Sequence, residues 1–179
     1  PIRGVVEPHA SVDIEISDGA NVVTKTIETD EDGRFEEIFD LSTLRDGELT
    51  ANFRATDNAG NVGEAQVITL EKDTAAPAGV VMNQPSYVNS RNQSNFTIKG
   101  SSVEEGATVE MVVSDGTTTV RQSTQVVNGA FEANFNLSGL KDGPLTFEAR
   151  QTDRAGNRSI AEATTIVKDT VVENAIATK

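Results

Sequence analysis

Carboxylates are the most frequent chemically active groups in this sequence. Its 179 residues include 28 Asp and Glu, one histidine and no cysteine. Because His9 is the only imidazole, a Ser-His-Asp site has a single candidate base, and cysteine nucleophiles and thiolate metal sites are excluded. We therefore expect no enzyme. The chemistry that remains is the binding of a hard cation by carboxylate and amide oxygens, and it depends on where the acidic residues lie.

The composition limits the partners that the chain could bind. A formal net charge of −13 argues against nucleic acid and anionic membranes, because both are bound through clusters of Lys and Arg. No apolar run approaches the roughly 18 residues that span a bilayer, and no Gly-rich phosphate loop is present. We expect no nucleic acid, no membrane insertion and no small-molecule substrate. The acidity itself is explained either by solubility or by cation binding.

The chain repeats itself after 96 residues. The segment Asp57-Asn58-Ala59-Gly60-Asn61 returns as Asp153-Arg154-Ala155-Gly156-Asn157. The same offset relates Leu41-Ser42-Thr43-Leu44 to Leu137-Ser138-Gly139-Leu140, Asp46-Gly47 to Asp142-Gly143, and Lys72-Asp73-Thr74 to Lys168-Asp169-Thr170. These matches indicate two modules that arose by tandem duplication.

Each module has the pattern of short β-strands separated by turns. Apolar and polar residues alternate in the first module over segments that are broken by Asp-Gly turns about every ten residues. The strands predicted from this alternation are 12–16, 22–27, 35–39, 49–55 and 65–70. No segment shows a convincing helical period. Short antiparallel strands in modules of about 95 residues predict an all-β protein built from two tandem immunoglobulin-like β-sandwiches.

The first module is predicted to lack its first strand. In the second module an apolar run at 80–82 and a polar loop precede the strand 96–100. The first module begins directly at Pro1 with the counterpart of that later strand, which leaves an exposed sheet edge. The expected boundaries are 1–72 for the first module, 73–77 for the linker and 78–169 for the second module. Residues 170–179 are expected to be a tail or the start of a following module.

Several motifs carry a family resemblance. They are Glu7-Pro8-His9-Ala10, Ser-Asp-Gly at 17–19 and 114–116, Leu-Ser-x-Leu-x-Asp-Gly at 41–47 and 137–143, Thr-Asp-x-Ala-Gly-Asn at 56–61 and 152–157, and Lys-Asp-Thr-Ala-Ala-Pro at 72–77. Together they extend over nearly the whole chain, which resembles the bacterial immunoglobulin-like repeats of giant adhesins exported by type I secretion, including RTX and biofilm-associated adhesins. The resemblance implies modules stacked into a rod, with neighbouring modules of the same chain as partners and calcium at the junctions.

The topology predicts where the acidic turns fall. Alternate loops of a β-sandwich lie at opposite ends, so the Asp18 and Asp46 turns are expected at the exit of the first module and the Asp153 loop at the entrance of the second. The calcium ligands predicted at this junction are Asp73, Asp153, Glu71, Asp46, Asn157 and Asp18. Oxygen ligands suit Ca²⁺, which accepts about six to eight of them. A second candidate site at the top of the first module consists of Asp57, Asp30 and Asn61.

Turn formation offers another explanation for several of these residues. Gly supplies positive φ in Asp-Gly and Asn-Gly turns, and the Asp side chain bonds the local backbone. Asp18 and Asp46 can therefore be turn residues only, and Asn61 and Asn157 can simply close their loops. The expectation that Asp73 and Asp153 bind calcium rests chiefly on the family resemblance.

Two functions remain open from the sequence. The first is a structural spacer in a secreted or surface-attached bacterial adhesin, stiffened by calcium between its modules and promoting adhesion or biofilm formation. The second is a recognition module that binds a carbohydrate or a protein. Recognition sites usually expose aromatic side chains, and this chain has one tyrosine, Tyr87, and no tryptophan. The spacer is therefore favoured.

Overall fold

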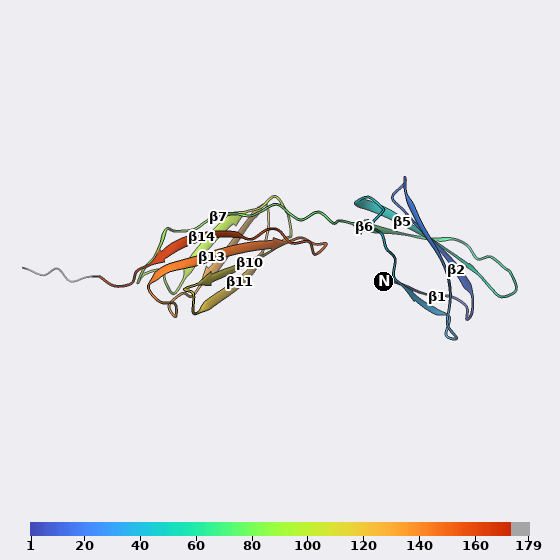
Figure 1. The fold of residues 1–179 in the computed structure, drawn as a ribbon, viewed down its shortest axis with the longest axis horizontal. Coiled ribbons are helices and arrows are strands. Elements are labelled where there is room, and N and C mark those ends of the chain that lie inside the picture. Colours follow the sequence, from blue (N-terminus) through green and yellow to red (C-terminus); the bar gives the residue numbers. More distant parts are fainter. Residues whose placement is uncertain (173–179) are drawn as a thin grey trace, which may run out of the picture. The chain divides into compact units, whose positions relative to one another are not determined.

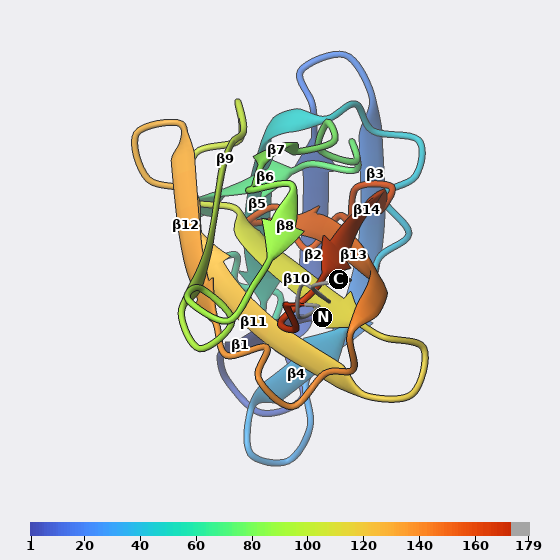
Figure 2. The ribbon, with the colours of Figure 1, turned by 90° about the vertical axis from the view of Figure 1, so that its left-hand side faces the viewer.

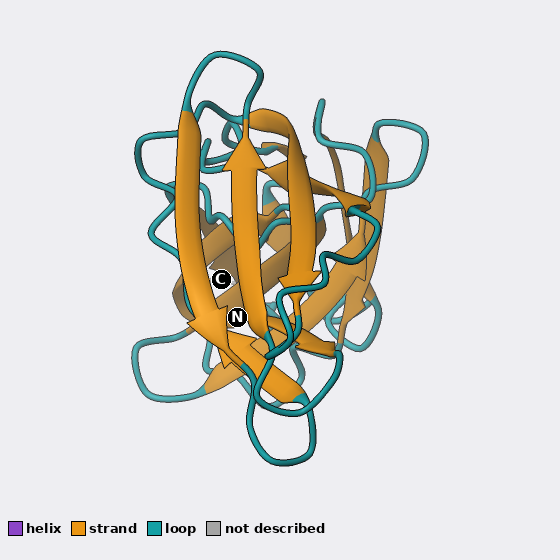
Figure 3. Cartoon of the chain, turned by 90° about the vertical axis from the view of Figure 1, so that its right-hand side faces the viewer, coloured by secondary structure: helices purple, strands orange, loops and turns teal. Residues whose placement is uncertain are grey.

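The chain is all-β. A computed structural model describes residues 1–172, and these residues form fourteen strands and no helix (Figure 3). They divide into two compact units, which we call module 1 (Pro1–Thr74) and module 2 (from Ala75 onward). Since the described residues contain no helix, none of them forms a membrane-spanning helix.

Module 1 contains six strands. They are β1 (Ile2–Val5), β2 (Ser11–Ser17), β3 (Val22–Glu28), β4 (Arg34–Glu37), β5 (Gly47–Thr56) and β6 (Gln66–Lys72). Four of them form an antiparallel sheet in the order β3-β2-β5-β6, and β1 pairs with β4 in a separate two-stranded sheet. Period-two alternation explains the sheet: Val12, Ile14 and Ile16 of β2 are buried, whereas Asp13 and Glu15 face solvent.

Module 2 contains eight strands in the described residues. They are β7 (Val81–Asn83), β8 (Tyr87–Val88), β9 (Phe96–Ser101), β10 (Thr108–Ser114), β11 (Thr119–Gln125), β12 (Ala130–Phe135), β13 (Gly143–Thr152) and β14 (Glu162–Lys168). One sheet has the order β11-β10-β13-β14-β8, and β10, β13 and β14 run side by side in Figure 1. The other has the order β12-β9-β7, and Figure 2 shows the paired β9 and β12 at the left.

The first strand of module 2 is divided between its two sheets. Its β7 part pairs antiparallel with β9, and its β8 part pairs parallel with the final strand β14. Between these parts the chain moves from one sheet edge to the other and places Val80 and Val88 in the core. Among the described residues, module 1 has no counterpart of β7 or β8. The prediction that module 1 lacks its first strand is confirmed.

The hydrophobic cores of the two modules differ in how completely their aromatic side chains are buried. Module 2 buries the aromatic side chains Phe96, Phe131, Phe135 and Phe147. In module 1 the aromatic residues Phe35, Phe39 and Phe53 are only partly buried and pack around a smaller group of fully buried aliphatic residues. Burial of apolar surface is the main stabilising contribution to a fold, so module 2 is expected to be the more stable module.

Strand β4 is shorter than the sequence predicted. The alternation indicated a strand over 35–39, but β4 ends at Glu37, and Phe39 lies beyond it. Its counterpart β12 continues to Phe135, because Phe135 pairs with Phe96 of β9. In module 1 the pairing of β4 with β1 reaches Glu37, opposite Ile2.

Candidate functional site

The carboxylate of Asp18 organises the turn between β2 and β3. Its Oδ1 accepts hydrogen bonds from the backbone N–H groups of Ala20 at 2.8 Å and Asn21 at 2.7 Å. Its Oδ2 accepts from the Asn21 side-chain amide at 2.9 Å and from the Arg45 N–H at 2.7 Å. The side-chain bond from Asn21, with the three backbone bonds, holds the pKa of Asp18 well below its usual range. A carboxylate offers about four acceptor positions, so the turn itself satisfies Asp18.

Module 2 repeats this arrangement around Asp115. The carboxylate accepts hydrogen bonds from the backbone N–H groups of Lys141 at 2.9 Å, Thr118 at 2.6 Å and Thr117 at 2.8 Å. These bonds favour the ionised form and lower the pKa of Asp115 to about 2. In both modules the acidic turn therefore also anchors a second loop, which precedes β5 in module 1 and β13 in module 2.

The acid stability of module 2 should depend on Asp115. The folded-state pKa is lowered from 3.8 to about 2, so the ionised carboxylate stabilises the fold above about pH 4, and this contribution disappears as the pH falls through about 2. We expect Asp115→Asn to lower the melting temperature at pH 7 and to flatten its fall between pH 4 and pH 2. Thermal melts across this range measure the effect. Glu148→Gln on the exposed face of β13 is the control, and parallel curves for both variants would contradict the assignment.

The end of module 1 is fastened to its Asp-Gly turn. The Oδ2 atom of Asp46 accepts hydrogen bonds from the N–H of Thr74 at 3.0 Å and from its Oγ1 at 2.8 Å. Lys72 lies 3.1 Å from Oδ1 of Asp46 and donates to the carbonyl of Leu44 at 2.7 Å. The bonds from Thr74 and Lys72 lower the pKa of Asp46. We call this arrangement of Asp-Gly turn and Lys-Asp-Thr segment the exit clamp.

The exit clamp of module 2 uses the equivalent residues with a more deeply buried lysine. Asp142 accepts hydrogen bonds from the N–H of Thr170 at 3.1 Å and from its Oγ1 at 2.8 Å. Lys168 is only 3% exposed, and its Nζ donates to the carbonyls of Leu137 at 3.0 Å and Leu140 at 2.5 Å. Neither Lys72 nor Lys168 was among the predicted site residues. Their signal was present, because Lys-Asp-Thr and Leu-Ser-x-Leu-x-Asp-Gly recur together at one offset.

The Asp-x-x-x-Asn loops close on themselves. Oδ1 of Asp57 accepts the N–H of Asn61 at 2.8 Å, and Oδ2 accepts its side-chain amide at 2.7 Å. The corresponding bonds from Asn157 to Asp153 measure 2.8 and 3.0 Å. The bonds from Asn61 lower the pKa of Asp57. Desolvation raises the pKa of Asp153, but the bonds from Asn157 and the loop backbone outweigh it, so the net shift is downward.

The predicted acidic residues of module 1 lie at its two ends. Asp18 and Asp46 belong to adjoining turns, because Arg45 donates to Asp18, and Asp46 also contacts the chain as it leaves β6. Asp30 lies at the other end, where its Oδ1 accepts the N–H groups of Asp32 at 2.9 Å and Arg34 at 2.8 Å. Glu71 and Asp73 are exposed.

The described residues contain no ready-made metal cluster. Within 1–172, no three or more His, Cys, Asp or Glu side chains are grouped so that they could hold a metal ion. Asp18 instead bonds N–H groups of its own turn, as the alternative explanation expected, whereas Asp46 bonds Thr74 and Lys72 of the segment that leaves β6. Calcium binding by Asp73, Asp153 and their neighbours stays a prediction.

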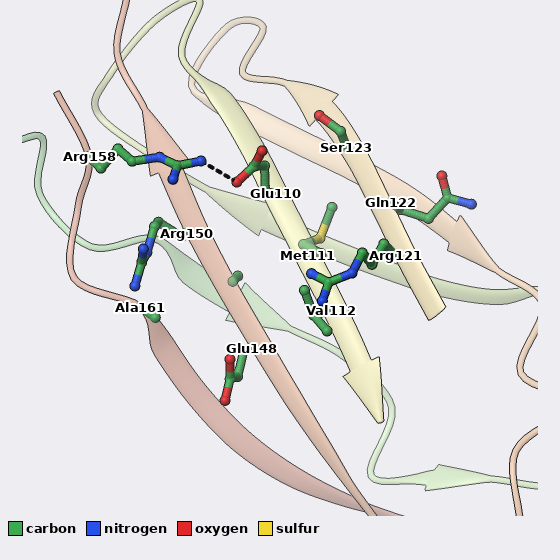
Figure 4. Close-up of a pocket in the computed structure, with 11 residues that line it drawn as sticks. Glu110, Met111, Val112, Arg121, Gln122, Ser123, Glu148, Arg150, Arg158 and Ala161 are labelled. Atoms are coloured by element: carbon green, nitrogen blue, oxygen red, sulfur yellow. Dashed lines mark hydrogen bonds and ion pairs between the residues drawn. The ribbon is translucent and has the colours of Figure 1, made fainter. Parts of the chain in front are cut away.

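The outer face of the larger sheet of module 2 carries a shallow open groove (Figure 4). Charged side chains from three strands line it, including Arg121, Glu148 and Arg150. Arg158, in the loop between β13 and β14, forms a 2.8 Å ion pair with Glu110 of β10. The described lining residues include no aromatic side chain. A solvated, charged sheet face explains this groove without a ligand.

Comparison with known proteins identifies the modules. Two family models, both described as a bacterial Ig-like domain, match residues 9–72 and 85–170. No curated protein matches the chain. One similar solved structure is a tetra-tandem repeat in the extending region of a large adhesion protein, with 27% identity and a TM-score of 0.45. That match covers 92% of this chain and 44% of the other, so the chain spans less than half the length of that structure.

Two further structures contain fibronectin modules. The FN1–FN3 domains of chicken CNTN1 match with 14% identity and a TM-score of 0.48, covering 90% of this chain and 56% of theirs. The fibronectin(III)-like modules of Clostridium thermocellum CbhA match with 14% identity and a TM-score of 0.51, covering 100% and 88%. The similarity to the CbhA modules supports the β-sandwich fold. Ig-like and fibronectin(III)-like domains are typically structural modules without catalytic activity. Residues 9–72 and 85–170 are bacterial Ig-like domains, and the chain is a tandem of two such modules.

Proposed function

We propose that the chain is a spacer segment of a large bacterial surface adhesin exported by type I secretion, of the RTX or biofilm-associated kind. The observation that carries this proposal is the exit clamp, which is present in both tandem modules. In module 1 it ties Thr74, the last residue of the unit, to the Asp46 turn and so fixes the point at which the chain leaves the sandwich. A fixed exit limits bending at the end of a module, as a spacer requires.

The location proposed for the protein is the bacterial surface or the extracellular space. Bacterial Ig-like domains and the absence of cysteine both suit a protein that crosses the envelope unfolded and then folds without disulfides. In this role the modules carry no adhesive site of their own. They separate the cell from a distant adhesive domain and thereby promote adhesion or biofilm formation.

Calcium is proposed to stiffen the connection between the modules. The proposed ligands are Glu71 and Asp73, which flank Lys72 at the end of module 1, and Asp153, whose loop is expected at the entrance of module 2. Carboxylates brought near one another repel, and a divalent cation converts this repulsion into attraction. Asp18 is not proposed as a direct ligand, because its own turn already uses its acceptor positions.

Calorimetric titration tests the calcium proposal. Calcium added to the full chain is expected to bind with a Kd of about 0.1–1 mM, the range of extracellular calcium modules. Asp73→Asn should weaken binding by about tenfold or more, because it removes one anionic ligand. Glu148→Gln changes the net charge equally but lies on a sheet face, so it should leave binding unchanged. Absence of binding heat, or an equal loss in both variants, would reject a calcium site at Asp73.

A further inference from the structure

Asn128 and Gly129 form the turn between β11 and β12, and they are the only Asn-Gly pair in the sequence. Both residues have positive φ, 54° for Asn128 and 73° for Gly129. The flanking residues Val127 and Ala130 exchange backbone hydrogen bonds of 2.8 and 3.1 Å across the turn. These features are typical of a two-residue type I′ turn. The Asn128 side chain is exposed, so its amide group is in contact with water.

An Asn-Gly peptide contains the reactants for a spontaneous covalent rearrangement. Once a base has removed its proton, the Gly129 nitrogen can attack the side-chain carbonyl carbon of Asn128. A carbon–nitrogen bond forms, the side-chain nitrogen takes up the proton and leaves as ammonia, and a five-membered succinimide ring remains. Water then opens the ring at one of its two carbonyl carbons and leaves either aspartate or isoaspartate. Glycine permits this attack because it has no Cβ beside the nitrogen.

Glu105 holds this turn closed. Its two carboxylate oxygens accept the N–H of Asn128 at 3.1 Å and the N–H of Gly129 at 3.0 Å. The succinimide ring contains the Cα–C bond of Asn128, so ring closure requires rotation about this bond away from the value of a type I′ turn. The turn therefore has to open before the ring can form. Opening breaks both hydrogen bonds to Glu105, and bonds to a charged acceptor are the stronger kind.

Module 1 carries an aspartate at the position of Asn128. The 96-residue offset relates Asn128 to Asp32, whose Oδ2 lies 3.3 Å from Nη1 of Arg34. In module 2 the position of Arg34 is occupied by Ala130. A carboxylate at position 128 would therefore lack the arginine partner that its counterpart has in module 1.

Deamidation would instead place a second negative charge beside Glu105. Where the loops align, Glu7-Pro8 of module 1 corresponds to Glu104-Glu105, so module 1 has no carboxylate at this position. Arg154 lies against Gly106 of the same loop, but the described residues contain no ion pair between Arg154 and Glu105. The new carboxylate would repel Glu105 and weaken the contact between the β9–β10 loop and the β11–β12 turn.

We propose that Asn128 is a site of spontaneous deamidation and that Glu105 limits its rate by keeping the turn closed. The modification converts a neutral side chain into a carboxylate, and the isoaspartate product adds one carbon to the main chain of a two-residue turn. The same turn holds the residue that follows β9, because the N–H of Ser102 donates to the carbonyl of Gly129 at 3.1 Å. Each deamidated copy should therefore have a looser β9–β10 loop. This inference goes beyond the proposed spacer function and does not depend on calcium.

Mass spectrometry of the aged full chain locates the modification. The folded protein is incubated in mildly alkaline buffer and digested with trypsin, which releases residues 122–141 as one peptide that also contains Asn134 and Asn136. An unaged sample digested in parallel corrects for reaction during the digest. We expect isoaspartate and aspartate at Asn128 only, because Asn134 and Asn136 precede the bulky residues Phe135 and Leu137. Equal conversion at the three positions would overturn the proposal. So would an unchanged Asn128 after many half-lives of the free peptide 122–141.

Glu105→Gln tests the control of the rate. Glutamine keeps the size of the side chain but removes its charge and one of its two acceptor oxygens. Asn128 should then deamidate about tenfold faster, which corresponds to the loss of one hydrogen bond to a charged group. Glu104→Gln is the matched control, because it removes the same charge from the neighbouring position and leaves both bonds of Glu105 in place. A slower reaction in Glu105→Gln, or equal acceleration in both variants, would overturn the role given to Glu105.

Asn128→Asp tests the consequence of the modification. Hydrogen exchange over residues 102–106 should be faster than in the wild type, because the introduced carboxylate repels Glu105. Adding Ala130→Arg recreates the Asp32–Arg34 ion pair of module 1 and should restore part of the protection. Wild-type exchange in Asn128→Asp would contradict the expected loosening of the loop.

Discussion

Replacing Phe147 with alanine is expected to lower the free energy of unfolding of module 2 by about 3–5 kcal/mol. The side chain is 0% exposed at the centre of β13 and forms an edge-to-face contact with Phe135, with ring centroids 6.2 Å apart and an interplanar angle of 84°. Alanine would remove this contact and leave a cavity that both sheets border. Interiors are close-packed, so the surrounding side chains can fill such a space only in part.

Urea denaturation of the full chain measures the loss as a shift in the module 2 transition. Phe53→Ala is the comparison in module 1, because Phe53 is the aromatic residue of β5 and is only partly buried. Phe53→Ala should lower the free energy of unfolding of module 1 by clearly less than Phe147→Ala lowers that of module 2. It should leave the midpoint of the module 2 transition unchanged. If the two substitutions cost the same, the difference in core coverage between the modules would be refuted.

Replacing Lys168 with methionine is expected to lower the free energy of unfolding of module 2 by about 2–4 kcal/mol. Methionine has a similar shape but no N–H donors, so the carbonyls of Leu137 and Leu140 lose their ammonium partner inside the protein. Each buried acceptor that is left without a partner costs about 1–3 kcal/mol. The loop between β12 and β13 should loosen, and with it the exit from module 2.

The same denaturation experiment checks this prediction, together with hydrogen exchange at the loop. Lys99→Met is the control, because Lys99 is largely exposed and forms only a surface ion pair with Glu132 at 3.1 Å. It should change stability by less than about 1 kcal/mol. Equal stability of wild type and Lys168→Met would show that the clamp lysine does not hold the loop.

Much of the fold could be predicted from the sequence because the duplication and the period-two alternation are local signals. The exchange of Ala51 and Phe53 for Phe147 and Ala149 keeps the aromatic ring on one face of the strand, as the alternation required. The absent first strand was also visible, because the second module supplied a template for it. The end of β4 was predicted wrongly, because the alternation continues to Phe39 whereas the pairing with β1 ends at Glu37.

The candidate site was less predictable because it depends on which hydrogen bonds the acidic side chains already make. The spacing of the turns along the sequence predicted that Asp18 and Asp46 lie at the same end of module 1. The structure places them in adjoining turns. Spacing could not show that Asp18 accepts four hydrogen bonds within its turn and the adjoining loop. The spacing also could not show that the lysine of each Lys-Asp-Thr segment, Lys72 or Lys168, donates hydrogen bonds to backbone carbonyl groups of its own module.

The proposed spacer role requires that calcium set the stiffness of the connection between the two modules. Small-angle X-ray scattering of the full chain, recorded in about 5 mM calcium and again in excess chelator, tests it most directly. We expect a larger maximum dimension and reduced flexibility with calcium, and we expect Asp73→Asn to lose both effects. Superimposable scattering profiles with and without calcium would contradict it.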